Sequence, residues 1–179
     1  MNHLSLMRMW KTFVLAGMCL ATSVAWAAPA QEDPNALLRS FLKDHDAKKG
    51  VFAVKRDQLD RFFNKELAAL IRRDMAEVDK TGEIALIDFD IIYFSQDPMI
   101  TDLKIDKAVI GGILKHKGDE PIEGLATIHM TYKDNGEESS TGFQFGLNAE
   151  KEWRIDDIHY QEGSSLKELL EGVYPAKAK

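Results

Sequence analysis

The spacing of apolar residues changes once along this chain, and that change restricts the folds it can adopt. From residue 33 to about residue 82, apolar side chains recur every three or four positions, which is the period of an amphipathic helix. From residue 103 onward they alternate with polar residues, as in a strand with one buried face. Helices followed by strands, rather than alternating with them, favour an α+β fold with an antiparallel sheet.

Two amphipathic helices are expected before the sheet. The first begins at Pro34 after the capping acid Asp33, and is predicted to end at Gly50. The second is predicted to run without interruption from Asp57 to near Gly82. Its apolar face carries Leu59, Phe62, Phe63, Leu67, Leu70, Ile71, Met75 and Val78.

Four strands are predicted in the second half of the chain. The dipeptide Asn135-Gly136 favours a tight hairpin between the second and third strands, and short connections of this kind join antiparallel neighbours. The apolar alternation shifts after Ile155, which predicts a β-bulge near Asp156-Asp157. The inward residues of the four strands are expected at Leu103, Ile105 and Val109; at Ala126, Ile128, Met130 and Tyr132; at Phe143, Phe145 and Leu147; and at Trp153 and Ile155.

A last helix closes the predicted fold. Ser165 and Glu168 have the spacing of a capping box, and Pro175 ends the helical pattern. The sequence therefore predicts N-terminal helices packed on a curved four-stranded antiparallel meander, with a short C-terminal helix. Residues 34–174 are expected to form a single domain, flanked by flexible segments at 28–33 and 175–179.

The first 27 residues have the organisation of a secretory signal peptide. Arg8 and Lys11 precede an uncharged apolar run, and a small-x-small cleavage sequence ends at Ala27. We expect Sec-dependent export, cleavage before Ala28 and a periplasmic location in a Gram-negative cell, with no stable membrane insertion afterwards. The alternative is an uncleaved membrane anchor, because the uncharged stretch nearly reaches the length that spans a bilayer.

Charge and cysteine content exclude several classes of protein. Cys19 is the only cysteine and lies within the leader, so the mature chain has no thiol for a disulfide, a nucleophile or a metal site. The formal charge of −6 becomes −8 once Arg8 and Lys11 are removed. An acidic chain without a long basic run argues against binding to nucleic acid or to anionic lipid.

Two segments carry a resemblance to a known family. Ile87-Asp-Phe-Asp-Ile-Ile-Tyr-Phe-Ser-Gln-Asp-Pro98 is followed by a hydrophobic meander, by Trp153-Arg-Ile-Asp-Asp-Ile158 and by a Leu-rich terminal helix. Over residues 34–174 this pattern resembles the family catalogued as domain of unknown function 3828. The resemblance implies a secreted or envelope protein with a nuclear transport factor 2-like or cystatin-like roll, and it transfers no catalytic residues. Where family members carry a lipoprotein cysteine, this chain has none.

An acidic segment is the first candidate binding site. Asp88, Asp90 and Asp97 lie within ten residues, together with Tyr93 and Gln96. If residues 88–90 are extended, the first two acids share a face and could contact a ligand or a partner. The structural alternative is that these acids cap helices, bond loop amides or begin a turn. Their spacing fits no calcium loop, so we predict neither a metal site nor a cofactor.

The polar side of the central strands is the second candidate. Thr127, His129 and Thr131 alternate with apolar residues on one strand, and Gln144 does so on the next. His129 could act as a general base, but an exposed strand residue explains it equally well. His159 lies beside Asp156-Asp157 and could form a bonded pair. The histidine spacing matches no zinc motif.

These features favour a non-enzymatic binding module that contacts an envelope protein or a small ligand and has no catalytic residue. The sequence leaves a homodimer open. One alternative is an immunity or inhibitor protein against a cationic toxin that attacks the cell wall, because the acidic charge would accelerate capture. Another is a small acid-base isomerase or hydrolase that uses a desolvated aspartate. A deep apolar cavity around Asp88, Asp90 or Asp157 would favour the enzyme, whereas a filled core would favour surface recognition.

Overall fold

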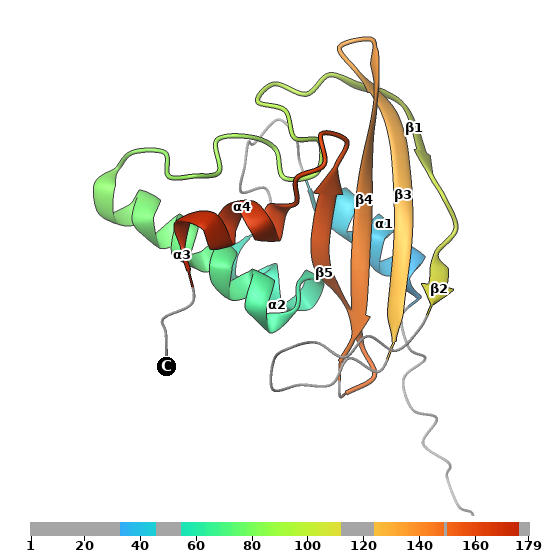
Figure 1. Ribbon diagram of the computed structural model, residues 1–179, viewed down its shortest axis with the longest axis horizontal. Helices are drawn as coiled ribbons and strands as arrows, with labels where there is room; N and C mark the ends of the chain where they lie inside the picture. Colours follow the sequence, from blue (N-terminus) through green and yellow to red (C-terminus); the bar gives the residue numbers. More distant parts are fainter. Residues whose placement is uncertain (1–32, 46–54, 112–123, 149, 176–179) are drawn as a thin grey trace, which may run out of the picture. The chain divides into compact units, whose positions relative to one another are not determined.

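Five antiparallel strands and four α-helices make up the described part of the chain (Figure 1). The computed structural model describes residues 33–45, 55–111, 124–148 and 150–175. The elements follow one another as α1 (Pro34–Asp44), the 3-10 helix η2 (Arg56–Gln58), α2 (Leu59–Phe62), α3 (Lys65–Thr81), β1 (Ile100–Ile105), β2 (Val109–Gly111), β3 (Leu125–Asp134), β4 (Glu137–Leu147), β5 (Trp153–Tyr160) and α4 (Leu166–Val173). The predicted α+β class is confirmed. The predicted signal peptide and the tail after residue 175 lie outside the described residues. The predicted end of the first helix at Gly50 is wrong, because α1 ends at Asp44 and the next residue, His45, is already extended.

The sheet has the order β1-β3-β4-β5, and β2 pairs with β3 beyond the end of β1. β3 and β4 are joined by Asn135-Gly136, whose φ angles of 52° and 88° are those of the tight turn that the sequence predicts. β4 and β5 are also antiparallel neighbours. The predicted meander is therefore correct for the last three strands.

The first predicted strand is wrong in its inward residues, because the chain forms two strands there. β1 contains an irregularity between Thr101 and Lys104, with Asp102 at a φ of 54°. This extra residue turns Leu103 outward, where it is 42% exposed, and Val109 is 67% exposed. Ile105 does lie on the core side, opposite Met130.

The second predicted helix is interrupted, because the chain pairs with the sheet before α3 begins. Phe63 is extended and forms a parallel bridge with Ile155, whose carbonyl accepts a hydrogen bond from the Asn64 amide at 2.9 Å. The Asn64 side chain then accepts from the Leu67 amide and caps α3. At the other end, Gly82 adopts a φ of 71° and ends α3 as predicted.

The predicted bulge in β5 is confirmed. Gln144 lies opposite Asp157 whereas Phe145 lies opposite Ile155, which leaves Asp156 as the extra residue. The start of α4 is confirmed as well, since the hydroxyl of its N-cap residue Ser165 accepts from the Glu168 amide.

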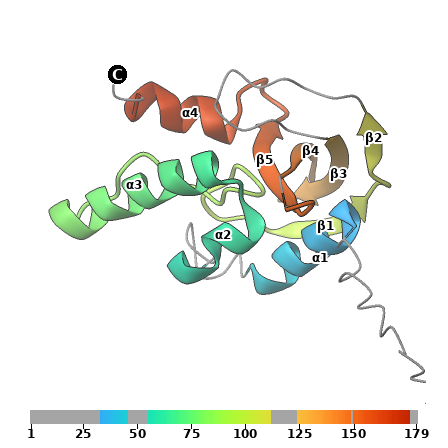
Figure 2. The ribbon, with the colours of Figure 1, turned by 90° about the horizontal axis from the view of Figure 1, so that it is seen from below.

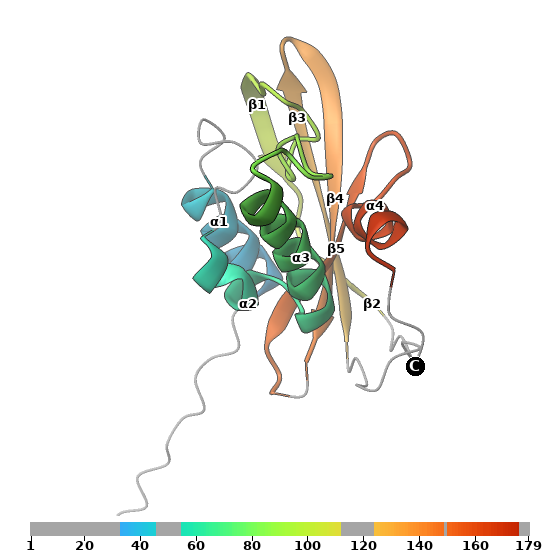
Figure 3. The ribbon, with the colours of Figure 1, turned by 90° about the vertical axis from the view of Figure 1, so that its left-hand side faces the viewer.

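The core lies between the helices and one face of the sheet, which we call the inner face. Helices α1, α2 and α3 lie on this side, and α4 runs beside β5 (Figures 2 and 3). Trp153 is 7% exposed, which confirms its predicted place in the core. Other core residues include Leu37, Phe41, Leu67, Ile71, Ile128, Phe143, Phe145 and Ile155. The opposite face of the sheet, which carries Thr127, His129, Thr131, Ser140 and Gln144, is called the outer face.

Candidate functional site

The outer face is organised into rows that cross the strands. Strand register places outward residues of neighbouring strands side by side, and successive rows lie two residues, or roughly 7 Å, apart along the strands. The predicted residues Thr127, His129, Thr131 and Gln144 belong to three of these rows. The four rows are Asp102, Lys133 and Glu138; Lys104, Thr131 and Ser140; His129, Gly142 and His159; and Thr127, Gln144 and Asp157.

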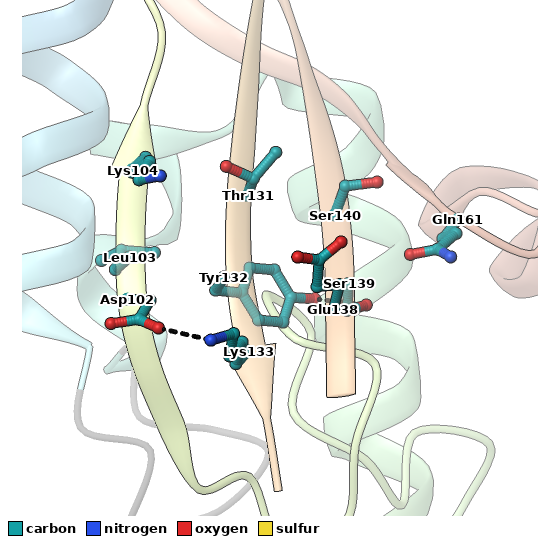
Figure 4. Close-up of a pocket in the computed structure, with 10 residues that line it drawn as sticks. All are labelled: Asp102, Leu103, Lys104, Thr131, Tyr132, Lys133, Glu138, Ser139, Ser140 and Gln161. Atoms are coloured by element: carbon teal, nitrogen blue, oxygen red, sulfur yellow. Dashed lines mark hydrogen bonds and ion pairs between the residues drawn. The ribbon is translucent and has the colours of Figure 1, made fainter. Parts of the chain in front are cut away.

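The first two rows lie in a concavity of about 930 Å³ at the end of the β3–β4 hairpin (Figure 4). The bulged residues Asp102 and Leu103 belong to its lining, as does Gln161 after β5. Figure 4 shows Lys104, Thr131 and Ser140 on three neighbouring strands, with Gln161 beyond them. The lining is therefore mostly polar and comes from four separate segments of the chain.

Two of the charged residues in this concavity pair with each other, whereas the row beside them makes no hydrogen bond within the described residues. Lys133 and Asp102 form an exposed ion pair at 2.9 Å, and their hydrogen bond lowers the pKa of Asp102 and raises that of Lys133. The side chains of Lys104, Thr131 and Ser140 make no hydrogen bond in the part of the chain that the structure describes. One ammonium group and two hydroxyls thus stand in a row, available to a ligand or a partner.

The histidines of the third row flank a residue that has no side chain. A Cβ atom added to Gly142 would lie 3.6 Å from Cε1 of His129 and 3.7 Å from Cβ of His159. The His129 ring therefore occupies the space above β4. Nε2 of His159 lies 3.8 Å from Oδ2 of Asp157, which is an ion-pair distance rather than a hydrogen bond. Within the described ranges, no group of three or more His, Cys, Asp or Glu residues is placed to hold a metal ion.

Gln144 has a structural partner that the sequence did not reveal. Its amide donates to Oδ2 of the buried Asp156 at 3.0 Å. The side-chain amide of Asn64 also donates to this carboxylate. Gln144 therefore helps to hold the bulge of β5, while Thr127, His129 and Thr131 carry no such contact among the described residues.

The acidic segment does not place Asp88 and Asp90 on one face, so that expectation is wrong. The chain bends at Phe89, and residues 90–95 then turn back, with the main-chain amide of Asp90 donating to the Ser95 carbonyl at 2.8 Å. Asp90 is 2% exposed. Asp88, by contrast, is exposed, and its carboxylate accepts a hydrogen bond from the side-chain amide of Gln96 at 2.9 Å. Asp97 is exposed as well.

Asp90 holds the turn together from inside. Its Oδ1 accepts from the amides of Ile92 and Tyr93 at 2.9 and 3.2 Å, so the predicted bonding of loop amides is confirmed. Its Oδ2 lies 2.6 Å from Nε2 of His45, which follows α1 and is also buried. The carboxylate is thus fully engaged by the protein itself.

Hydroxyl groups of the inner face fasten the same turn to the sheet. The carbonyls of Ile91, Ile92 and Tyr93 accept from Tyr160 at 3.0 Å, Thr141 at 2.7 Å and Tyr132 at 3.2 Å, respectively. Phe94 has a φ of 52°, a strained conformation for an aromatic residue, and its ring stacks on Tyr160 at 4.4 Å. Three strands and one helix end therefore determine the conformation of residues 90–95.

Burial keeps the tyrosines of this region neutral. Desolvation, followed by the negative charge of Asp90, raises the pKa of Tyr93 to about 12. Desolvation, with Asp157 next in importance, raises the pKa of Tyr160 well above its ordinary value. A protonated phenol can donate to a carbonyl, so these shifts fit the bond from Tyr160 to the turn.

Sequence reasoning missed His45, Tyr132, Thr141 and Tyr160 as partners of the acidic segment. Polar groups at inward strand positions were the available signal, because a buried hydroxyl requires an acceptor. Which acceptor it finds depends on the path of a loop 39 or more residues away, as for Tyr132 and Tyr93.

No helix among the described residues is long and apolar enough to cross a bilayer. No protein-family model, curated protein or solved structure matches the chain. The resemblance to domain of unknown function 3828 therefore stays a prediction.

Proposed function

We propose that this chain is an exported binding module of the bacterial periplasm that recognises an envelope protein or a small polar ligand without catalysis. The observation that carries this proposal is the row of Lys104, Thr131 and Ser140 in the outer concavity, whose side chains make no hydrogen bond within the described residues. His129 and Thr127 extend the same surface along β3. Short hydroxyl and imidazole side chains on a rigid sheet are adaptable contacts for a partner.

The state of the buried aspartates favours recognition over acid-base chemistry. Asp90 accepts two amide hydrogen bonds and faces His45, and Asp157 accepts from the amides of Ile158 and Lys167. Neither carboxylate lines the concavity. An aspartate acting as a general base needs access to its substrate, whereas Asp90 and Asp157 are only 2% and 8% exposed.

The fold and location belong to the same proposal. The sheet curves around the helices (Figure 2), which supports a roll of the nuclear transport factor 2-like or cystatin-like kind. The leader and the resemblance to domain of unknown function 3828 support export. N-terminal sequencing of the periplasmic fraction should read Ala-Pro-Ala-Gln-Glu from Ala28, and a full-length membrane-bound product would contradict export.

The recognition surface can be tested by photo-crosslinking in cells. A photoreactive residue at Thr131 should give a discrete adduct with an envelope component, whereas the same residue at the exposed Lys80 on α3 should give none. The substitution Lys104→Glu should weaken the adduct at position 131 without lowering the melting temperature, because Lys104 makes no hydrogen bond in the described structure. Identical adducts from both positions, or none from Thr131, would place recognition elsewhere.

A further inference from the structure

The two edges of the sheet differ in how their outermost strands are paired. Along the β5 edge, Phe63 forms a parallel bridge with Ile155 and Asn64 donates to its carbonyl, so another part of the chain covers the strand. At the opposite edge, β3 is the only strand that pairs with β2 among the residues that the structure describes. A strand with one free side presents main-chain donors and acceptors that can pair with a further strand.

The side chains of β2 show that the apolar face of the sheet continues past this edge. Ile110 lies opposite Ala126, a fully buried inner-face residue, yet Ile110 is 69% exposed. Val109 lies opposite Thr127 on the outer face and is 67% exposed. An inward-pointing isoleucine with this exposure lies beyond the part of the core that the described helices cover.

β2 is held in a strand conformation before any partner arrives. The Asn35 side chain donates to the Asp106 carbonyl and accepts from the Ala108 amide, both at 2.8 Å, which fixes the chain between β1 and β2. The Asp106 amide also donates to the His129 carbonyl at 2.9 Å. Preorganisation lowers the conformational entropy lost on association.

The charge pattern of this edge permits self-association at β2 and opposes it at β1. β1 carries Asp102, Lys104 and a bulge, all of which hinder the addition of another strand. β2, with the sequence Val-Ile-Gly, has no charge. Two copies can therefore approach at β2 without placing like charges opposite each other within the paired strands.

We propose that β2 pairs with β2 of a second copy of this chain, antiparallel and about a two-fold axis at Ile110. An antiparallel pair of identical strands is self-complementary, as a two-fold interface requires. The two copies of Ile110 then meet on the inner face, and Val109 of each copy lies opposite Gly111 of the other. The two sheets become continuous, so the outer faces extend side by side.

The size of this contact predicts a concentration-dependent dimer. Three residues per copy bury far less than the roughly 800 Å² per partner of a stable interface. Sedimentation equilibrium should therefore show the mean mass rising from monomer towards dimer between about 10 µM and 1 mM, affinities in the range of weak complexes. Hydrogen exchange at residues 109–111 should slow over the same range.

Two isoleucine variants give a matched test. Ile110→Lys should keep the chain monomeric at every concentration, whereas Ile84→Lys should dimerise like the parent, because Ile84 is 73% exposed but lies outside the sheet. Circular dichroism should show both variants folded, since both positions are exposed. A parent chain that stays monomeric, a dimer that survives Ile110→Lys, or a dimer that both substitutions abolish would each overturn the proposal. Since none of these readouts involves the concavity, failure here would leave the proposed recognition function standing.

Discussion

Consecutive residues of β3 and β4 place the same chemical group in opposite environments. Tyr132 and Thr141 face the core and direct their hydroxyls to the carbonyls of Tyr93 and Ile92. Their neighbours Thr131 and Ser140 face outward, and their hydroxyls make no hydrogen bond within the described structure. A buried polar group without a partner costs about 1 to 3 kcal/mol, whereas an exposed one is hydrated. The inner hydroxyls are thus structural, and the outer ones are available for recognition.

Removing a large inner-face side chain should have the greatest effect. Trp153 is 7% exposed, and Trp153→Ala should lower the free energy of unfolding by about 3 to 5 kcal/mol, because it leaves a cavity in the core. Urea denaturation followed by circular dichroism measures this loss. A loss below about 1 kcal/mol would mean that the core does not depend on this ring.

Removing the buried carboxylate should have the next largest effect. Asp90→Ala leaves the amides of Ile92 and Tyr93 and the His45 ring without their acceptor, and should cost about 2 to 4 kcal/mol. Asp97→Ala in the same segment is the control, and since Asp97 is exposed it should stay within about 0.5 kcal/mol of the parent. Equal losses would show that the segment does not depend on the buried acid.

Single hydroxyl deletions test the comparison of the two faces directly. Tyr132→Phe and Thr141→Val should each lower the free energy of unfolding by about 1 to 2 kcal/mol, because they leave a carbonyl of the turn unpaired. Thr131→Val and Ser140→Ala, one residue away, should change it by less than about 0.5 kcal/mol. If the outer substitutions cost as much as the inner ones, the outer hydroxyls have a structural role.

The tyrosines should make the free energy of unfolding depend on pH only in the alkaline range. The folded-state pKa of Tyr93, about 12, lies above the value near 10 of an unfolded chain, so its contribution is complete below pH 10 and is lost as the pH rises towards 12. The pKa of Tyr160 is raised in the same direction by burial. Absorbance at 295 nm should show native phenols ionising later than those of the urea-unfolded chain. Superimposable titration curves would contradict the burial of these rings.

Local signals in the sequence predicted much of the fold. The turn at Asn135-Gly136, the cap at Ser165 and the bulge beside Asp156 each depend on residues close in sequence, and each is present. The break at Asn64 could not be predicted from helical periodicity, because Phe63 leaves the helix to pair with Ile155 on a strand that comes much later in the chain.

The two candidate sites also differ in whether local signals in the sequence predict them. Alternation along β3 correctly grouped Thr127, His129 and Thr131 on one face, since period two is a local property. The same reasoning failed for Asp88 and Asp90, because the chain bends at Phe89 and Asp90 is buried against His45, which follows α1. Whether a polar residue contacts the protein or the solvent depends on such tertiary contacts.

The contacts that close the fold connect segments far apart in sequence, and this bears on how the protein would cross a membrane. Asn35 reaches Asp106 across 71 residues, and Arg73 reaches the carbonyl of Tyr174 across 101. Loop closure over such lengths slows folding, and the N-terminal helices lack these partners until most of the chain is present. A chain exported as proposed would therefore remain unfolded, and fit for translocation, until its C-terminal part has been synthesised.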